Sequence, residues 1–214
     1  MLQRIDHIDR KVSSYVHTMI SHHFLLDCLI LAFGKLFNRG GIVIALVLSG
    51  LFAYYVPGTP LPIISKDNIH YNEVGVYILT QIMAILTLLV VTQSFKYLIK
   101  RKRPHHGEGC PLRHFDLAVH EVGTWAMPSG DTAQGALWFT MTQLFFFGQM
   151  QIPIVLIVGT VLVGFSRVYF RCHWIGDVII GAAAGIVEGF IFHRQYLRIG
   201  TFLTESLPEV FINF

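Results

Sequence analysis

The chain has 214 residues, of which 53% are hydrophobic and only 14% are charged, whereas an ordinary soluble domain carries about 25% charged residues. Its 16 basic and 13 acidic residues leave a net charge of +3, which is too weak a field to attract nucleic acid. This composition excludes a soluble globular domain, a disordered chain and a coiled coil. It predicts an integral membrane protein folded as one compact bundle, with the lipid bilayer as its surroundings.

The first 23 residues predict an amphipathic helix, because apolar residues recur at helical spacing and charged residues fall mostly on the other face. The apolar set is Ile5, Ile8, Val12, Tyr15, Val16 and Met19, and the charged set is Asp6, Asp9, Arg10 and Lys11. Two placements are open for this helix: it lies on the membrane surface, or it packs on the bundle.

Five apolar stretches have the length, or nearly the length, of about 20 residues that a helix needs to cross a bilayer. They are 41–56, 74–98, 132–150, 152–170 and 174–192. A sixth stretch, 24–37, contains Asp27 and Lys35, and is interpreted as a short interfacial or re-entrant helix or as a poorly marked first span. The expected fold is an all-α, multi-pass transmembrane helical bundle of about five to six spans.

The chain is expected to form a single domain over residues 1–214, because it contains no internal repeat and no low-complexity tract. Within it we expect interfacial N-terminal helices at 1–38, a helical bundle at 39–195 and a C-terminal tail at 196–214. The longest polar connection is 100–130, and long connections of this kind are often functional. Its first residues, Lys100, Arg101 and Lys102, are interpreted as a juxtamembrane cluster attracted to anionic headgroups.

The polar residues at the ends of the apolar stretches are expected to converge. If each stretch crosses the membrane once, one set of polar residues falls on a single membrane face. The set consists of Lys96, Arg103, Ser129, Gly130, Asp131, Arg167, His173 and Asp177.

This set has the composition of a phosphate site. Arginine binds phosphate oxygens through two donors and lysine acts as a point charge, so Lys96, Arg103 and Arg167 are candidate phosphate ligands. Ser129 and Gly130 precede a helix, so their backbone N–H groups can point at an anion. His173 and Asp177 are four residues apart at the start of a helix and share a face. A carboxylate that accepts one imidazole N–H leaves the other nitrogen to attack phosphorus, which suits transfer through a phosphohistidine.

Three strings in this order resemble the signatures of the type 2 phosphatidic acid phosphatase superfamily. Residues 96–104 match K-x6-R-P, residues 128–130 match P-S-G-H except at its last position, and residues 166–177 match S-R-x5-H-x3-D at every fixed position. The motifs cover 96–177, and the helical framework extends the similarity over most of the chain. Three motifs in order, each at the same membrane depth, make the resemblance specific.

The resemblance implies a membrane lipid phosphatase of phospholipid metabolism. It assigns phosphate binding to Lys96, Arg103 and Arg167, assisted by Ser129 and Gly130. It makes His173 the nucleophile and Asp177 the residue that orients it. It implies no metal and no other cofactor, and a lipid phosphate as substrate: phosphatidate, phosphatidylglycerol phosphate, a polyprenyl diphosphate or lipid A.

Asp131 stands where the family has a histidine that is thought to protonate the leaving group. One interpretation is that Asp131 is itself the general acid, acting best at acidic pH. A second is that His105, His106 or His120 substitutes for it. A third is that the substrate is a diphosphate, whose leaving group needs little protonation. The alternatives to hydrolysis are a lipid phosphotransferase with the same site and a catalytically impaired lipid-phosphate binding protein.

The orientation of the chain follows from the end of the last stretch. Arg194 and Arg198 obey the positive-inside rule if that end lies in the cytoplasm. We therefore expect the site on the extracytoplasmic or lumenal face. The sequence leaves the oligomeric state open.

Overall fold

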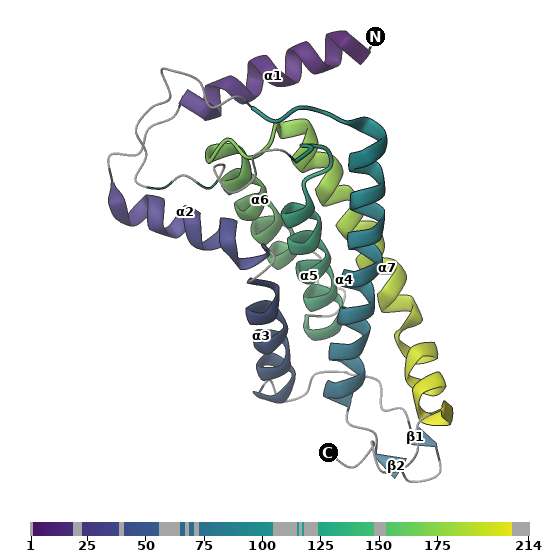
Figure 1. Cartoon of the computed structure of the whole chain (residues 1–214). Helices are drawn as coiled ribbons and strands as arrows, with labels where there is room; N and C mark the ends of the chain where they lie inside the picture. The colour runs from purple at the N-terminus through teal and green to yellow at the C-terminus, as the bar shows by residue number, and fades with distance from the viewer. Residues whose placement is uncertain are drawn as a thin grey trace.

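The computed structural model describes residues 2–18, 23–38, 41–55, 65–66, 69–70, 73–104, 115, 117, 124–147 and 153–206. The regular structure in this part of the chain is helical apart from one short antiparallel pair of strands, β1 (Ser65–Lys66) and β2 (Ile69–His70). The helices, drawn in Figure 1, are α1 (Leu2–Thr18), α2 (Phe24–Leu36), α3 (Gly41–Tyr55), α4 (Glu73–Ile99), α5 (Gly130–Phe146), α6 (Ile154–Tyr169) and α7 (Ile175–Ser206). The expected all-α fold is confirmed.

Helix α5 is the centre of the bundle and contacts α3, α4, α6 and α7. Its closest neighbour is α7, which presents small residues one helical turn apart along the contact. A side chain at Gly181 or Gly185 would collide with the backbone carbonyl of Ser129 or Ala133 on the opposite side. Glycine there lets the two backbones approach closely, as small residues do between membrane helices. This contact fixes the start of α5 against the start of α7.

Two helices are long and apolar enough to cross a membrane within the described residues: Gly75–Ile99 of α4 and Ile175–Phe202 of α7. Helices α2 and α3 pass the same test together, but they meet at 85°, so they count as a broken span or a re-entrant segment. Helices α5 and α6 have 17 and 16 residues, so each rises only about 25 Å. The multi-pass helical bundle is confirmed. Within the described residues, length and composition alone identify two helices that could span a membrane, or three with the bent pair, and the expected number of five to six stays a prediction.

Helix α2 belongs to the bundle and packs on α6. Its Asp27 is fully buried and accepts a hydrogen bond of 2.8 Å from the Tyr169 hydroxyl. At its other end, the space beside Gly34 is filled by the side chain of Ser166. The acidic residue in this apolar stretch therefore has a structural partner, as a polar group at membrane depth requires.

Helix α1 lies across one end of the bundle, over the ends of α6 and α7 (Figure 1). It packs through its polar face, while four apolar side chains are exposed: Ile5, Ile8, Val12 and Tyr15. Helix α1 therefore contacts the bundle, as one of the two placements predicted, but through its polar face and not through its apolar face. The contact with a membrane surface stays a prediction. At the other end of the chain, α7 continues past residue 195, where a tail was expected, to Ser206.

Candidate active site

The candidate site lies at the end of the bundle that α1 covers. Four helix ends meet there: α4 ends after Lys96, α6 ends after Arg167, α5 begins after Ser129, and α7 begins just beyond His173. The chain is brought to this point by the close contact of α5 with α7, and the Ser129 amide donates to the Asp177 carbonyl at 3.0 Å. Helix ends supply both backbone donors and dipole charge, which makes such a junction suitable for an anion.

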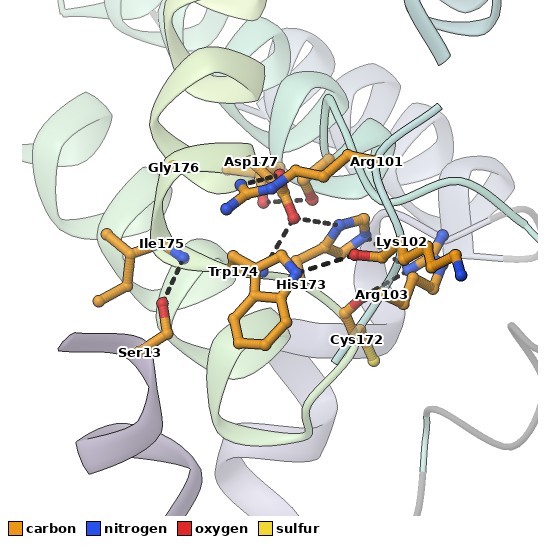
Figure 2. Close-up of polar contacts among 12 residues, drawn as sticks. Ser13, Arg101, Lys102, Arg103, Cys172, His173, Trp174, Ile175, Gly176 and Asp177 are labelled. Atoms are coloured by element: carbon orange, nitrogen blue, oxygen red, sulfur yellow. Dashed lines mark hydrogen bonds and ion pairs between the residues drawn. The ribbon is translucent and has the colours of Figure 1, made fainter. Parts of the chain in front are cut away.

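His173 is buried between a cation and a carboxylate (Figure 2). Its Nε2 lies 3.1 Å from Nη1 of Arg103, and its Nδ1 lies 3.7 Å from Oδ2 of Asp177. Because a guanidinium only donates, its contact with Nε2 is a hydrogen bond in the tautomer that leaves Nε2 unprotonated. In that tautomer the ring proton is on Nδ1, on the side of Asp177. This is the tautomer that leaves an Nε2 lone pair for attack.

Two hydrogen-bond donors hold Asp177 in place. Its Oδ2 accepts the Trp174 backbone N–H at 2.9 Å, which is the reciprocal contact of a helix N-terminal capping box. Its Oδ1 accepts Nη1 of Arg101 at 2.6 Å. Both oxygens are therefore engaged, and the carboxylate plane has one orientation relative to His173.

Three cations surround the imidazole. Burial lowers the pKa of His173 well below its ordinary value, and the charges of Arg103, Arg167 and Lys96 lower it further, in that order. A hydrogen bond with the Ala126 backbone acts in the opposite direction. The imidazole is therefore neutral at neutral pH.

The cations are held in different ways. Arg103 donates to the Cys172 carbonyl at 2.6 Å and to the Thr124 hydroxyl at 2.9 Å. Burial lowers the pKa of its guanidinium, and the neighbouring acidic groups offset part of this decrease. The Lys96 ammonium lies 3.9 Å from the position that a Cβ would take on Gly130, at the first residue of α5. A lysine and a helix N-terminus therefore face the same point.

The two residues at the start of α5 differ in what they can offer. Both backbone N–H groups were expected to point at an anion, but for Ser129 this is wrong, because its N–H is bonded to Asp177. The Ser129 hydroxyl pairs with the Thr132 hydroxyl at 2.9 Å. Its observed contacts fasten α5 to α7, and the Gly130 amide remains the candidate donor to an anion.

Asp131 is paired with one of the expected phosphate ligands. Its Oδ2 lies 3.1 Å from Nη1 of Arg167, whose side chain is 2% exposed. The same Nη1 donates to the Gly34 carbonyl at 3.3 Å, so α2 also contributes to this corner of the site. A carboxylate thus pairs with a guanidinium that was expected to bind phosphate.

Sequence reasoning missed Arg101. It was grouped with Lys100 and Lys102 as a headgroup-binding cluster, and for Arg101 this is wrong: its side chain is 10% exposed and pairs with Asp6, Asp9 and Asp177. The backbone at Lys100 has φ 50°, a left-handed conformation uncommon outside glycine, and the next residue turns inward. The signal was absent from the local pattern because the three carboxylates are distant in sequence.

The loop histidines proposed as substitutes for the general acid, His105, His106 and His120, lie outside the described residues. Within the part that the structure describes, no three His, Cys, Asp or Glu side chains are grouped as metal ligands would be.

The fold and the site define a membrane-embedded helical protein with a cation-lined histidine at one end of its bundle. A family model of the PAP2 superfamily matches residues 77–200, which contain all three motifs. The chain belongs to the PAP2 superfamily, as the resemblance of its motifs predicted. A search of curated proteins finds no match.

Two solved structures share the fold. A transmembrane PAP2-type phosphatidylglycerolphosphate phosphatase from Bacillus subtilis matches with a TM-score of 0.61 and 18% identity, over 89% of this chain and 85% of the other. LpxE from Aquifex aeolicus matches with a TM-score of 0.59 and 23% identity, over 87% of this chain and 95% of the other. These similarities establish that the chain has the architecture of a membrane PAP2 protein.

Proposed function

We propose that the protein is a membrane lipid phosphatase that works through a phosphohistidine without a metal ion. The observation that carries this proposal is the buried row of Arg103, His173 and Asp177, with 3.1 Å on one side of the imidazole and 3.7 Å on the other. In this proposal Nε2 attacks the terminal phosphorus and the bond from that phosphorus to the leaving-group oxygen breaks, so that a diphosphate releases a lipid monophosphate and a monoester releases a lipid alcohol. Asp177 stabilises the imidazolium that forms. Water then attacks the phosphohistidine and releases inorganic phosphate.

The charge distribution supports the binding step. The charges of Lys96, Arg103 and Arg167 all act on the His173 ring, so they also attract a phosphoryl group in contact with Nε2. Fixed donors aimed at the equatorial oxygens stabilise the charge of the transition state. The Gly130 amide at the start of α5 adds the positive end of a helix dipole.

The Asp131–Arg167 pair bears on the choice of substrate. An ion pair needs the ionised carboxylate, which accepts protons and hydrogen bonds but has none to donate. This favours a substrate whose leaving group departs without a general acid. We therefore propose a prenyl or other lipid diphosphate as the preferred substrate, ahead of phosphatidate and phosphatidylglycerol phosphate. The same ion pair favours the impaired lipid-phosphate binder as the second candidate, if turnover is absent with every substrate.

The experiment is a phosphate-release panel with purified protein in detergent and a chelator, using phosphatidate, phosphatidylglycerol phosphate, prenyl mono- and diphosphates and lipid A. We expect the diphosphate to be hydrolysed fastest and His173→Ala to be inactive. Full activity of that variant would refute the phosphohistidine. Addition of a lipid or sugar alcohol distinguishes a phosphotransferase, which would form a phosphorylated acceptor in place of free phosphate.

We also propose that the site faces the extracytoplasmic or lumenal side, because Arg194 and Arg198 lie near the opposite end of α7. A cysteine placed at the exposed Lys102, with Cys28 and Cys110 replaced by serine, tests this. We expect a membrane-impermeant maleimide to label it in intact cells. Labelling only after the membrane is opened would reverse the orientation.

A further inference from the structure

Arg101 connects the N-terminal helix to the carboxylate that faces the candidate nucleophile. Its Nε and Nη2 donate to Oδ1 of Asp6 at 3.0 and 2.7 Å, and Nη2 also donates to Oδ2 of Asp9 at 2.7 Å. Its Nη1 donates to Oδ1 of Asp177 at 2.6 Å (Figure 2). One guanidinium thus holds two carboxylates of α1 with one edge and the Asp177 carboxylate with the other.

Helix α1 also caps the helix that carries Asp177. The Ser13 hydroxyl accepts the Ile175 N–H and Oδ1 of Asp9 accepts the Gly176 N–H, each at 2.9 Å. Together with the bond from Trp174 to Asp177, three successive N–H groups at the start of α7 are satisfied by side chains. The first N–H groups of a helix have no partner within that helix, so these side chains, two of them from α1, fix where α7 begins.

The far end of α1 is fastened as well. Arg171, in the turn that leads to His173, donates from Nη2 to the His17 carbonyl at 2.9 Å. The backbone carbonyls of Arg101 and Lys102 accept hydrogen bonds from the Ala126 N–H and the Trp174 indole. The segment that bears Arg101 is therefore bound on both sides to the loops that hold His173.

We propose that Arg101 is a positioning residue of the reaction, and that α1 acts on catalysis through it by fixing the orientation of the Asp177 carboxylate. Asp177 presents Oδ2 to His173 because its other oxygen is occupied by Arg101. Without Arg101, only the Trp174 N–H holds the carboxylate, which can then rotate about its last bond and move Oδ2 away from Nδ1 of His173. Arg101 can position a nucleophile only if His173 is one, so this role rests on the function proposed above.

The geometry requires arginine. A lysine carries the same charge on a single nitrogen, which can approach Asp177 or the two α1 carboxylates but cannot present a planar fork to all three. Arg101→Lys is therefore expected to preserve the electrostatic effect on His173 and to lose much of the orientation. Arg101→Met removes both and keeps a similar apolar stem.

Lys102 supplies the matched control. It is the next residue, it is exposed, and Lys102→Met removes the same unit charge from the same segment. With a prenyl diphosphate in detergent micelles, we expect Arg101→Met to lower kcat about 10- to 100-fold while KM changes less than about threefold, because a misplaced catalytic group weakens the transition state and not substrate binding. Lys102→Met should leave kcat unchanged. An unchanged kcat in Arg101→Met overturns the proposal.

A double-mutant cycle tests the link to α1. Asp6→Asn alone is expected to lower kcat by a few fold, and in the Arg101→Met background it should have no further effect, because both changes act on one carboxylate. Additive losses would show that α1 acts by another route and would overturn that part of the proposal. Thermal unfolding of each variant, followed in the same detergent, separates loss of positioning from loss of fold.

A readout without turnover separates this inference from the proposed function. The titration of the His173 ring, followed by ¹⁵N NMR in micelles and assigned with His173→Gln, should move to higher pH in Arg101→Met and stay in place in Arg101→Lys and Lys102→Met. The other charged groups around the ring, Lys96, Arg103, Arg167 and Asp177, are the same in all of these proteins. If the wild type releases no phosphate, the proposed function fails; if Arg101→Lys keeps both the His173 titration and the kcat of the wild type, Arg101 acts by its charge alone and the positioning role fails.

Discussion

Arg167 lies buried with two acceptors on one nitrogen, and Asp131→Asn removes the charged one. A buried donor that loses its partner costs about 1–3 kcal/mol, and the Gly34 carbonyl retains part of the contact, so we expect a loss of about 1–2 kcal/mol in the free energy of unfolding. For a chain of this length that corresponds to a Tm lower by about 2–8 °C.

The same substitution is expected to strengthen phosphate binding. In the wild type, an incoming phosphate must approach Arg167 beside a carboxylate of like charge. Asp131 is 22% exposed, so solvent weakens this repulsion, and we take it as about 1.4 kcal/mol, or a factor of about ten in Kd. Orthovanadate, a phosphate analogue, should therefore bind Asp131→Asn about tenfold more tightly than the wild type.

Thermal unfolding in detergent, with and without orthovanadate, measures both effects in one titration. The variant should melt lower than the wild type without the anion and gain more from it, since a ligand stabilises by RT ln(1 + [L]/Kd). Glu188→Gln, which removes a carboxylate from the apolar part of α7, is the control and should leave the anion response unchanged. Weaker vanadate binding by Asp131→Asn would refute the reasoning, because it would mean that Asp131 assists the anion.

Three further predictions follow from pH, helix packing and a buried pair. Burial and then the neighbouring cations lower the pKa of His173, so the folded protein keeps this ring neutral while the unfolded chain protonates it below about pH 6.5. The free energy of unfolding should therefore fall as the pH drops below about 6.5, and it should fall less steeply in His173→Gln. For the same reason kcat/KM should stay constant down to a pH below about 6.5. A loss of kcat/KM that begins above this pH would contradict the lowered pKa. Gly185→Leu should lose at least about 1–3 kcal/mol by forcing α5 from α7, whereas Ala183→Leu on the exposed face should be neutral in the same thermal assay, and equal effects would argue against the close contact. Tyr169→Phe leaves the buried Asp27 without its hydroxyl donor and should lower stability by about 1–3 kcal/mol; an unchanged Tm would show that this bond contributes nothing.

The sequence by itself determined the class of protein and the residues of the three motifs. A low charge fraction and long apolar stretches indicate a lipid environment. In lipid such a segment forms a helix, because a helix satisfies its own backbone hydrogen bonds. The spacing of His173 and Asp177 placed them on one helix face, and the motif order identified the family. These inferences rest on local periodicity and on short strings, which need no knowledge of how distant segments meet.

The tertiary structure decided which charges act together. Arg101 belongs by sequence to a basic run, yet it lies under α1 and binds carboxylates that are 76 to 95 positions away. The polar face of α1 was visible in the sequence, but its partner, the start of α7, was not. Asp131 likewise looked like a changed catalytic residue and is also the counter-ion of a buried arginine. Charge pairing at the end of a bundle depends on which helix ends are neighbours. Here the packing of α5 on α7, through close backbone contact at glycine, decides which ends meet. This contact is a property of the two helices together and cannot be read from the sequence of either one.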